Sequence, residues 1–144
     1  MRLSTRGHYG LKAMFDLAKH YGAGPIPLKS VAERQNISEH YLEQLIAVLR
    51  KSGLVRSVRG AQGGYILARS PDKIVVGDII RVLEGPIAPV ECVSELREVE
   101  CDQADCCITR TVWEKVRDSI VQVLDSITLE DMCKDEEKNR QARL

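Results

Sequence analysis

Four of the five cysteines of this 144-residue chain gather in one short stretch, ECVSELREVECDQADCCITR, which spans residues 91–110. In a reducing compartment, clustered thiols more often bind a metal or act in redox chemistry than form lasting disulfides. The intervals between the four cysteines are eight, four and no residues, whereas tetrahedral zinc sites usually draw on two close pairs. The spacing therefore favours a metal or cluster site over structural zinc, which stays an alternative together with redox-active thiols and cysteines that have no role.

The rest of the chain indicates the compartment. The N-terminal stretch MRLSTRGHYGLKAMFDLAKHYG has no long apolar core and no small-residue cleavage site, so it does not resemble a secretory signal. No other run approaches the roughly 18 apolar residues that a membrane span needs. We therefore expect a cytoplasmic protein with no membrane partner, in which the thiols are reduced.

The charges of the chain are unevenly distributed, although the formal net charge is zero. Residues 1–73 hold 12 Lys and Arg against 5 Asp and Glu, while residues 74–144 hold 9 against 16. A basic half favours a polyanionic partner, because each neutralised phosphate releases a counterion. This asymmetry predicts that the first half binds nucleic acid.

The expected secondary structure of the basic half predicts how this half binds nucleic acid. Apolar residues recur at helical spacing in residues 4–22, again briefly in residues 28–36, and then in residues 37–53, where Ser38 is the expected N-cap and Gly53 ends the helix. Two short helices joined by the tight turn RQNIS form a helix-turn-helix. With 44% hydrophobic residues but few aromatic ones, the chain fits a mainly helical domain with an aliphatic core.

A hairpin follows the second helix of this motif. Residues 54–68 alternate apolar and polar side chains around a glycine-rich turn, and the segment carries Arg56, Arg59 and, just beyond it, Arg69. A basic hairpin directly after a helix-turn-helix is a wing. In winged-helix proteins the second helix enters the major groove, and the wing reaches phosphates or the minor groove.

The exposed side of the recognition helix is the candidate base-reading surface. Glutamine pairs with adenine and a carboxylate accepts from cytosine, so Gln44 and Glu43 can both discriminate between bases. For each residue alone, a solvated helix face is the alternative. The predicted DNA contacts are Ser38, His40, Tyr41, Glu43 and Gln44 on the helix, with Glu39 beside them, and Arg56 and Arg59 on the wing.

The second half of the chain contains a short helix after Pro71, the cysteine loop and a long amphipathic segment. The segment places apolar residues every four positions from Ile108 to Leu124. It either caps the winged domain or packs against its counterpart in a second subunit, and the second arrangement suits a palindromic operator. We divide the chain into a DNA-binding domain (1–73), a short helix with the cysteine loop (74–107), a dimerisation helix (108–132) and a polar, frayed tail (133–144) in which Cys133 is incidental.

Several motifs together resemble one family of bacterial winged-helix regulators. MRLSTRGHYGLKAMFDLA, ISEHYLEQL, LRKSGLVRSVRGAQGGY and ITLEDM are similar to the family that includes the iron–sulfur cluster regulator IscR, the nitric oxide sensor NsrR and the cysteine-metabolism repressor CymR. LEGPIAPVE and SEHYLEQL resemble CymR, which lacks the cysteine loop, whereas the loop resembles that of IscR and NsrR. The resemblance covers roughly residues 1–133 and implies a mainly α winged helix-turn-helix with a two-stranded wing and a long C-terminal dimerisation helix, of IscR type on a CymR-like body.

The resemblance also implies a ligand set for an iron–sulfur cluster of the 2Fe–2S type. Cys92, Cys101 and Cys107 are the implied thiolates, because CITRTVW follows the family pattern of a last cysteine just before the long helix. IscR carries a histidine ligand three residues later, but this chain has Arg110 there, and a guanidinium cannot ligate iron. The fourth ligand is either His8, at a position where NsrR uses an N-terminal residue of the partner subunit, or Cys106.

The sequence thus predicts a regulator and not an enzyme. We expect a homodimeric transcription regulator that binds a double-stranded DNA operator under the control of its cluster and regulates iron–sulfur cluster biogenesis genes. A cluster-free repressor of cysteine metabolism acting with a partner enzyme, and a nitric oxide or redox sensor, are the alternatives. An electron-transfer protein would not need the basic half, and a thiol–disulfide enzyme would need a C-x-x-C motif at a helix start, which the sequence lacks.

Overall fold

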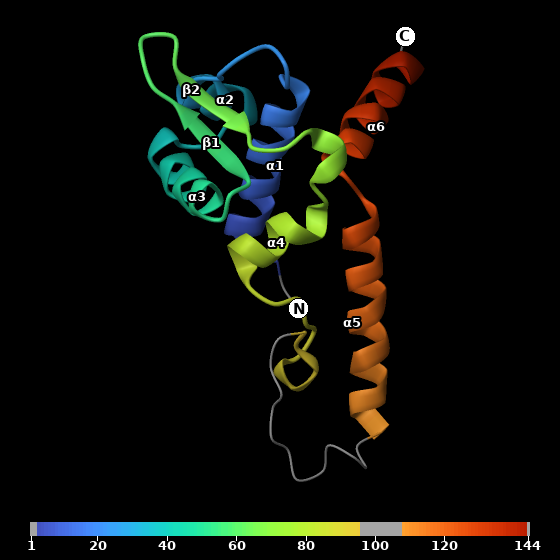
Figure 1. Ribbon diagram of the computed structural model, residues 1–144. Coiled ribbons are helices and arrows are strands. Elements are labelled where there is room, and N and C mark those ends of the chain that lie inside the picture. Colours follow the sequence, from blue (N-terminus) through green and yellow to red (C-terminus); the bar gives the residue numbers. More distant parts are fainter. Residues whose placement is uncertain (1–2, 96–107, 144) are drawn as a thin grey trace.

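The computed structural model describes residues 3–95 and 108–143. Figure 1 shows that α1, α2, α3 and the two strands form one lobe, from which α5 extends as a long arm. This arrangement confirms the predicted mainly α winged helix-turn-helix. No described helix is both long and apolar enough to cross a lipid bilayer. The elements are α1 (Thr5–Lys19), α2 (Leu28–Gln35), α3 (Glu39–Lys51), β1 (Val55–Val58), β2 (Gly64–Leu67), α4 (Val76–Glu84), α5 (Ile108–Ser126) and α6 (Leu129–Ala142), with short 3₁₀ turns η1 (Pro71–Lys73) and η2 (Glu91–Val93).

The core of the lobe is built on the apolar stripe that the sequence predicts for the recognition helix. Leu42, Leu45, Ile46 and Leu49 of α3 are at most 2% exposed. They pack with buried side chains of α1, α2, α4 and the wing in a single cluster. Since burial of one such side chain contributes about 2 kcal/mol, this stripe fixes which side of α3 remains outside.

The turn between α2 and α3 sets the geometry of the helix-turn-helix. Asn36 ends α2 in the left-handed conformation with φ of 54°, which Asn tolerates better than most residues. Ile37 follows and is buried. Ser38 then caps α3, since its side chain accepts a hydrogen bond from the Tyr41 amide at 3.1 Å. The predicted N-cap is therefore confirmed.

The wing is an antiparallel hairpin whose position on the lobe is fixed at one edge. Val55 pairs with Leu67 and Val58 pairs with Gly64. The chain before α2 adds a bridge to this sheet, because Ile26 and Tyr65 exchange backbone hydrogen bonds of 2.9 and 2.8 Å. Gly64 makes this close approach possible, since a Cβ there would lie 2.3 Å from the carbonyl oxygen of Ile26.

The C-terminal region differs from the expected single helix over 108–132 followed by a frayed tail. α5 ends at Ser126, and the supposed tail 133–144 is largely helical because α6 runs from Leu129 to Ala142. The break is caused by packing and capping. Leu129 is fully buried in the main core, and Thr128 and Asp131 form a capping box that starts a new helix.

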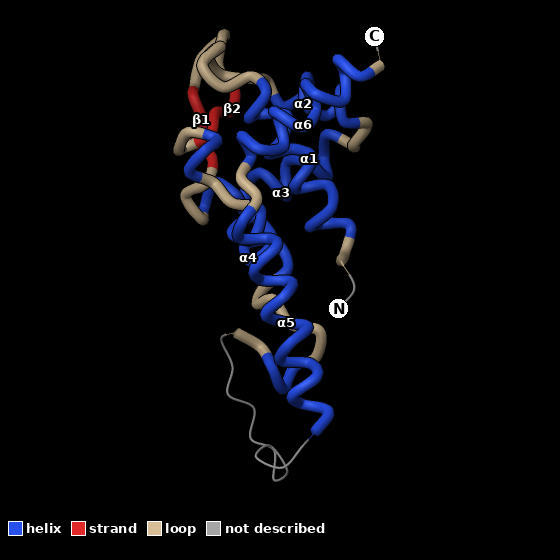
Figure 2. Tube along the Cα trace, turned by 90° about the vertical axis from the view of Figure 1, so that its right-hand side faces the viewer, coloured by secondary structure: helices blue, strands red, loops and turns tan. Residues whose placement is uncertain are grey.

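Each C-terminal helix packs against the rest of the described structure. The inner side of α5, through Ile120, Val121 and Leu124, joins Ile80 of α4 in a second apolar cluster. α6 packs against α1, and Lys19 forms an ion pair with Glu136 at 3.0 Å. Figure 2 shows α5 continuing away from the lobe, beyond α4.

Candidate nucleic-acid interface and cysteine loop

The outer side of α3 carries the residues that the sequence predicts to read bases. Ser38, His40, Glu43 and Gln44 are all exposed. His40 and Gln44 lie one helical turn apart, with Nε2 atoms separated by 3.4 Å. Ser38 caps α3, whereas the other three side chains have no role in the core and face solvent, where a ligand can reach them. Their contact with DNA stays a prediction.

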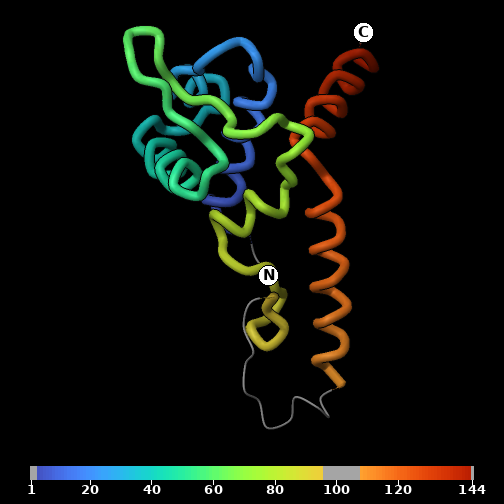
Figure 3. Tube along the Cα trace, viewed as in Figure 1, coloured from blue at the N-terminus to red at the C-terminus, as the bar shows by residue number. Residues whose placement is uncertain are grey.

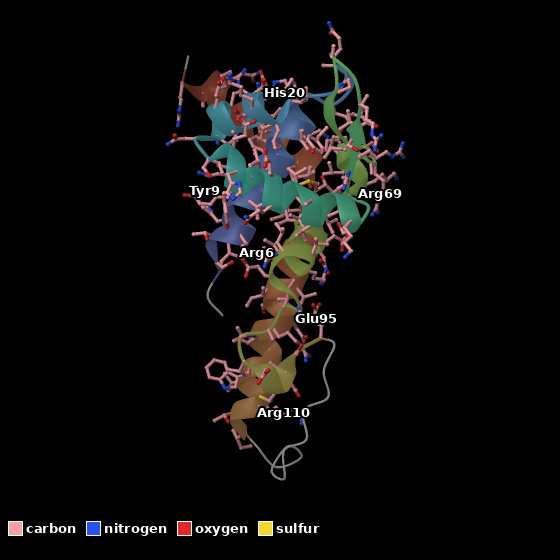
Figure 4. The ribbon with its side chains drawn as sticks, turned by 90° about the vertical axis from the view of Figure 1, so that its left-hand side faces the viewer. Arg6, Tyr9, His20, Arg69, Glu95 and Arg110 are labelled. Atoms are coloured by element: carbon pink, nitrogen blue, oxygen red, sulfur yellow. The ribbon has the colours of Figure 1, made fainter. Side chains whose placement is uncertain are left out.

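Tyr41 differs from its neighbours because it is half-buried. Its hydroxyl lies 3.3 Å from the Thr5 hydroxyl at the start of α1, and its ring packs edge-on against Tyr9 with centroids 6.1 Å apart. Figure 4 shows Tyr9 and Arg6 on the side of the lobe that carries α3. Tyr41 therefore orients the start of α3 on α1, in addition to its predicted contact with DNA.

Arginines around α3 and the wing lack the acidic partners that five arginines elsewhere in the described residues possess. Away from this surface, Arg34, Arg81, Arg110, Arg117 and Arg140 each form an ion pair with a carboxylate. By contrast, within the described residues Arg50, Arg56, Arg59 and Arg69 form none, and all four are exposed. The chain contains no Asp or Glu between Glu43 and Asp72. This surface therefore presents uncompensated positive charge beside the exposed side of α3.

A buried carboxylate fastens the helix-turn-helix to α1. Asp16 is fully buried, and Arg34 donates two hydrogen bonds to it, at 2.7 and 3.0 Å. Gln35 donates a third at 3.0 Å. Burial raises the pKa of the Asp16 carboxyl, but these donors outweigh burial and hold the pKa below its usual value. The ionised carboxylate thus ties the end of α2 to α1.

The segment that carries Cys92 is clamped between α4 and α5. Arg81 of α4 donates two hydrogen bonds of 3.0 and 2.8 Å to Glu95 and two of 2.8 and 2.9 Å to Asp125. Arg117 of α5 donates to the Val93 carbonyl at 3.0 Å. The hydrogen bonds from Arg81 hold the pKa values of the Glu95 and Asp125 carboxyls below their usual range. These contacts position the first predicted cluster ligand.

Cys92 itself is a free, half-buried thiol in η2. The other implied thiolates, Cys101 and Cys107, and the candidate Cys106 lie outside the described residues. No group of three possible metal ligands forms within residues 3–95 and 108–143. The described part of the chain thus presents a single member of the implied thiolate set, and the other members stay predictions.

Three further residues bear on the ligand question. His8 is exposed near the start of α1, so its imidazole is open to a neighbouring molecule. Arg110, at the position where the resemblance to IscR implies a histidine, pairs with Glu114 at 3.2 Å. Cys133 is half-buried on α6, and burial raises the pKa of its thiol, which disfavours the thiolate form that a metal needs.

With this geometry in place, comparison with known proteins identifies the family. The model of the Rrf2 family, described as iron-dependent transcriptional regulators, matches residues 3–135. The chain belongs to the Rrf2 family. It is therefore a DNA-binding transcription regulator and not an enzyme.

Relatives of both expected kinds are found within the Rrf2 family. CymR of Bacillus subtilis is 52% identical over 92% of this chain and 90% of its own length. IscR of Pectobacterium carotovorum is 43% identical over 95% of this chain and 82% of its own length. Among solved structures, T. potens IscR superposes with a TM-score of 0.80 and 60% identity, covering 96% of this chain and 90% of that one. The CymR structure from B. subtilis gives 0.78 and 53%, with 93% and 97% covered.

Two features of the site were missed by sequence reasoning. The Arg81 cluster joins residues from α4, the loop before residue 96 and α5, and nothing local in the sequence indicates that they meet. Arg50 was missed although a signal existed, because the acid-free interval between Glu43 and Asp72 includes it.

Proposed function

We propose that this Rrf2-family regulator is a homodimer that binds a palindromic DNA operator, with its affinity controlled by an iron–sulfur cluster. The observation that carries DNA binding is the row of unpaired arginines beside the exposed polar side of α3. In this arrangement α3 enters the major groove, where Gln44 and Glu43 read base edges. Arg59, in the turn of the wing, reaches the adjacent minor groove or its phosphates.

Support for the homodimer comes from the outer side of α5. Val112, Val116 and Val123 are 49%, 38% and 55% exposed, and Ile108 at the start of the helix is 79% exposed. These four residues lie along one stripe of α5, separate from the inner side that packs on α4. An exposed apolar stripe of this length favours burial against an equivalent helix. Two copies joined in this way would present two recognition helices to two half-sites.

The proposed cluster ligands are Cys92, Cys101 and Cys107, completed by His8 or Cys106. The donor set fits the group, because iron–sulfur clusters are held chiefly by cysteine thiolates. Such a cluster supplies a redox-sensitive and removable group whose presence reports on its own supply. The described residues of the protein would fix the position of the first ligand. Arg81 and Arg117 hold the segment around Cys92 on α4 and α5, so the loop begins from a fixed point.

A cluster-free repressor is the second candidate. It is favoured by the 52% identity to CymR, whose structure is described as that of the global cysteine regulator of B. subtilis. Under this alternative the loop cysteines act as thiols or have no role, and control comes from a partner enzyme. The four loop cysteines favour the cluster.

One experiment separates the two candidates. Protein purified anaerobically should show visible absorbance from the cluster, and Cys92→Ala, Cys101→Ala and Cys107→Ala should each remove most of it. Cys133→Ala is the matched control and should retain the spectrum. A colourless parent protein that still binds a duplex selected from genomic DNA would support the cluster-free repressor. Retained absorbance in Cys107→Ala would assign the third thiolate to Cys106.

A further inference from the structure

A shallow hollow lies between the C-terminal end of α3 and the base of the wing. It is lined by Arg50 from α3 and by Arg56 and Arg69 from the two sides of the hairpin. Gly53 also lines it, and a Cβ built at that position would meet no atom within 4 Å. Ser57 also belongs to the lining. Three arginines and a glycine therefore line one hollow that contains no acidic residue.

The charge in this hollow is not compensated by the protein. Within the described residues none of the three arginines has an ion pair. Arg56 instead donates a hydrogen bond to the Ala68 carbonyl at 3.3 Å, which leaves its positive charge unneutralised while restricting its orientation. A guanidinium is shaped for two parallel hydrogen bonds to a phosphate or a carboxylate. Such a hollow is suited to an anion with several oxygens.

The position of the hollow indicates which anion it meets. If α3 occupies a major groove and Arg59 reaches the neighbouring minor groove, the sugar–phosphate strand between the two grooves must cross the gap between α3 and the wing. The residues that line the hollow come from these same two elements. In Figure 4, Arg69 lies beside the wing, at the margin of the side that carries α3.

We propose that Arg50, Arg56 and Arg69 form a clamp for one backbone phosphate of the operator in each half-site. This inference rests on the proposed binding of DNA, and it adds a residue, Arg50, that neither the base-reading helix face nor the wing turn includes. A phosphate contact fixes the register of a protein on the duplex and carries no sequence information. The clamp would thus set the depth and angle of α3 in the groove.

The test measures binding of a fluorescent operator duplex as a function of salt. Arg50→Gln and Arg69→Gln should each weaken binding by about fivefold to tenfold, equally for the operator and for an unrelated duplex. Because both act on one phosphate, the double variant should lose less than the product of the single losses. Its salt dependence should fall by about one phosphate equivalent rather than two. Arg140→Gln on α6 is the control and should leave binding unchanged.

A neutral linkage in the DNA locates the phosphate. Methylphosphonate substitution at one position of each half-site should weaken binding of the parent protein and have little effect on the double variant. A parent protein that binds while both single variants match it would overturn the clamp and leave the proposed function intact. A parent protein that binds no duplex would overturn both. Competition by inorganic phosphate at constant ionic strength, lost in the double variant, would assign the hollow to the free anion instead.

Discussion

At the scale of single residues, the charged side chains of this chain divide into those that hold the fold and those that remain available. Asp16 belongs to the first group, because its carboxylate is fully buried and accepts hydrogen bonds from two residues of α2. The four unpaired arginines of α3 and the wing belong to the second. In the sequence, structural and available charged residues look alike. Only the interval without acidic residues around the wing indicated, before the structure, that the arginines there are available.

The substitution Asp16→Asn tests the structural role of this carboxylate. It should lower the free energy of unfolding by about 2 to 3 kcal/mol, since hydrogen bonds to a buried charged group are lost or weakened. Chemical denaturation at neutral pH would measure the loss. Asp135→Asn, on the exposed side of α6, is the control and should change little.

The pH dependence gives a second check on Asp16. Its folded-state pKa lies below the usual 3.8, so its contribution to stability is present above that value and is lost as the pH falls through the folded-state pKa. The difference in stability between parent and Asp16→Asn should therefore shrink below about pH 4. A difference that grew on acidification would contradict the proposed ion pair.

At the scale of elements, local patterns predicted each helix and strand of the winged domain, because caps, apolar periodicity and turn residues agree there. The same reasoning failed at the C-terminus. Apolar residues continue at helical spacing past residue 126, so periodicity alone extended the helix to 132. The break depends on burial of Leu129 in the core of a lobe built from distant residues. The Thr128 and Asp131 capping box was the one local signal, and it was visible in ITLEDM.

The α5 helix also shows why periodicity could not assign roles to its apolar positions. Ile120 and Leu124 contact the α4 cluster, whereas Val112 and Val116 are exposed, although all four belong to one repeating series. Because a spacing of four residues slightly exceeds the 3.6 residues of one helical turn, each successive member of the series is rotated further around the helix axis. The inner side serves the subunit itself, and the outer side is available to a second copy.

Val116→Glu tests the outer side of α5. A charge placed in an apolar interface between two copies should shift the protein from dimer to monomer, because burial of an unpaired carboxylate is costly. Sedimentation velocity at micromolar concentration would measure the shift, with the helical content of the monomer unchanged. Gln122→Glu adds the same charge on the polar side of α5 and should leave the dimer intact. A Val116→Glu protein that sediments as the parent does would remove this stripe from the interface.

At the scale of the whole molecule, the wing and the start of α5 lie at opposite ends, while α6 returns to the lobe and packs against α1. Figure 3 shows the start of α1 between the wing and the start of α5. Leu3 lines a hollow together with Pro86 and Ile87, and Glu84 at the end of α4 accepts hydrogen bonds from Ser4 and, at 2.8 Å, from the Gly7 amide. The start of α1 therefore lies between the cysteine-bearing segment and α3, which it meets through Thr5 and Tyr41.

Because of this placement, the identity of the fourth cluster ligand decides how the cluster is coupled to the recognition helix. His8 is exposed on the same turn of α1 whose amide is held by Glu84. If the imidazole of one subunit binds the cluster of the other, gain or loss of the cluster pulls directly on the helix that supports Tyr41 and the start of α3. Cys106 as the fourth ligand would confine the change to the loop. The two possibilities thus predict different coupling to DNA.

His8→Ala distinguishes them. If His8 is a ligand, the variant should have an altered and weaker cluster spectrum, and the ratio of operator affinities with and without the cluster should approach one. His20→Ala removes an imidazole from the other end of α1, where its ring bonds the Asp16 carbonyl, and should leave the spectrum unchanged. A His8→Ala protein that matches the parent in both spectrum and affinity ratio would exclude His8 from ligation and from coupling. Cys106 would then be the favoured fourth ligand, and the connection between loop and recognition helix would have to pass through Arg81 and Glu84 within one subunit.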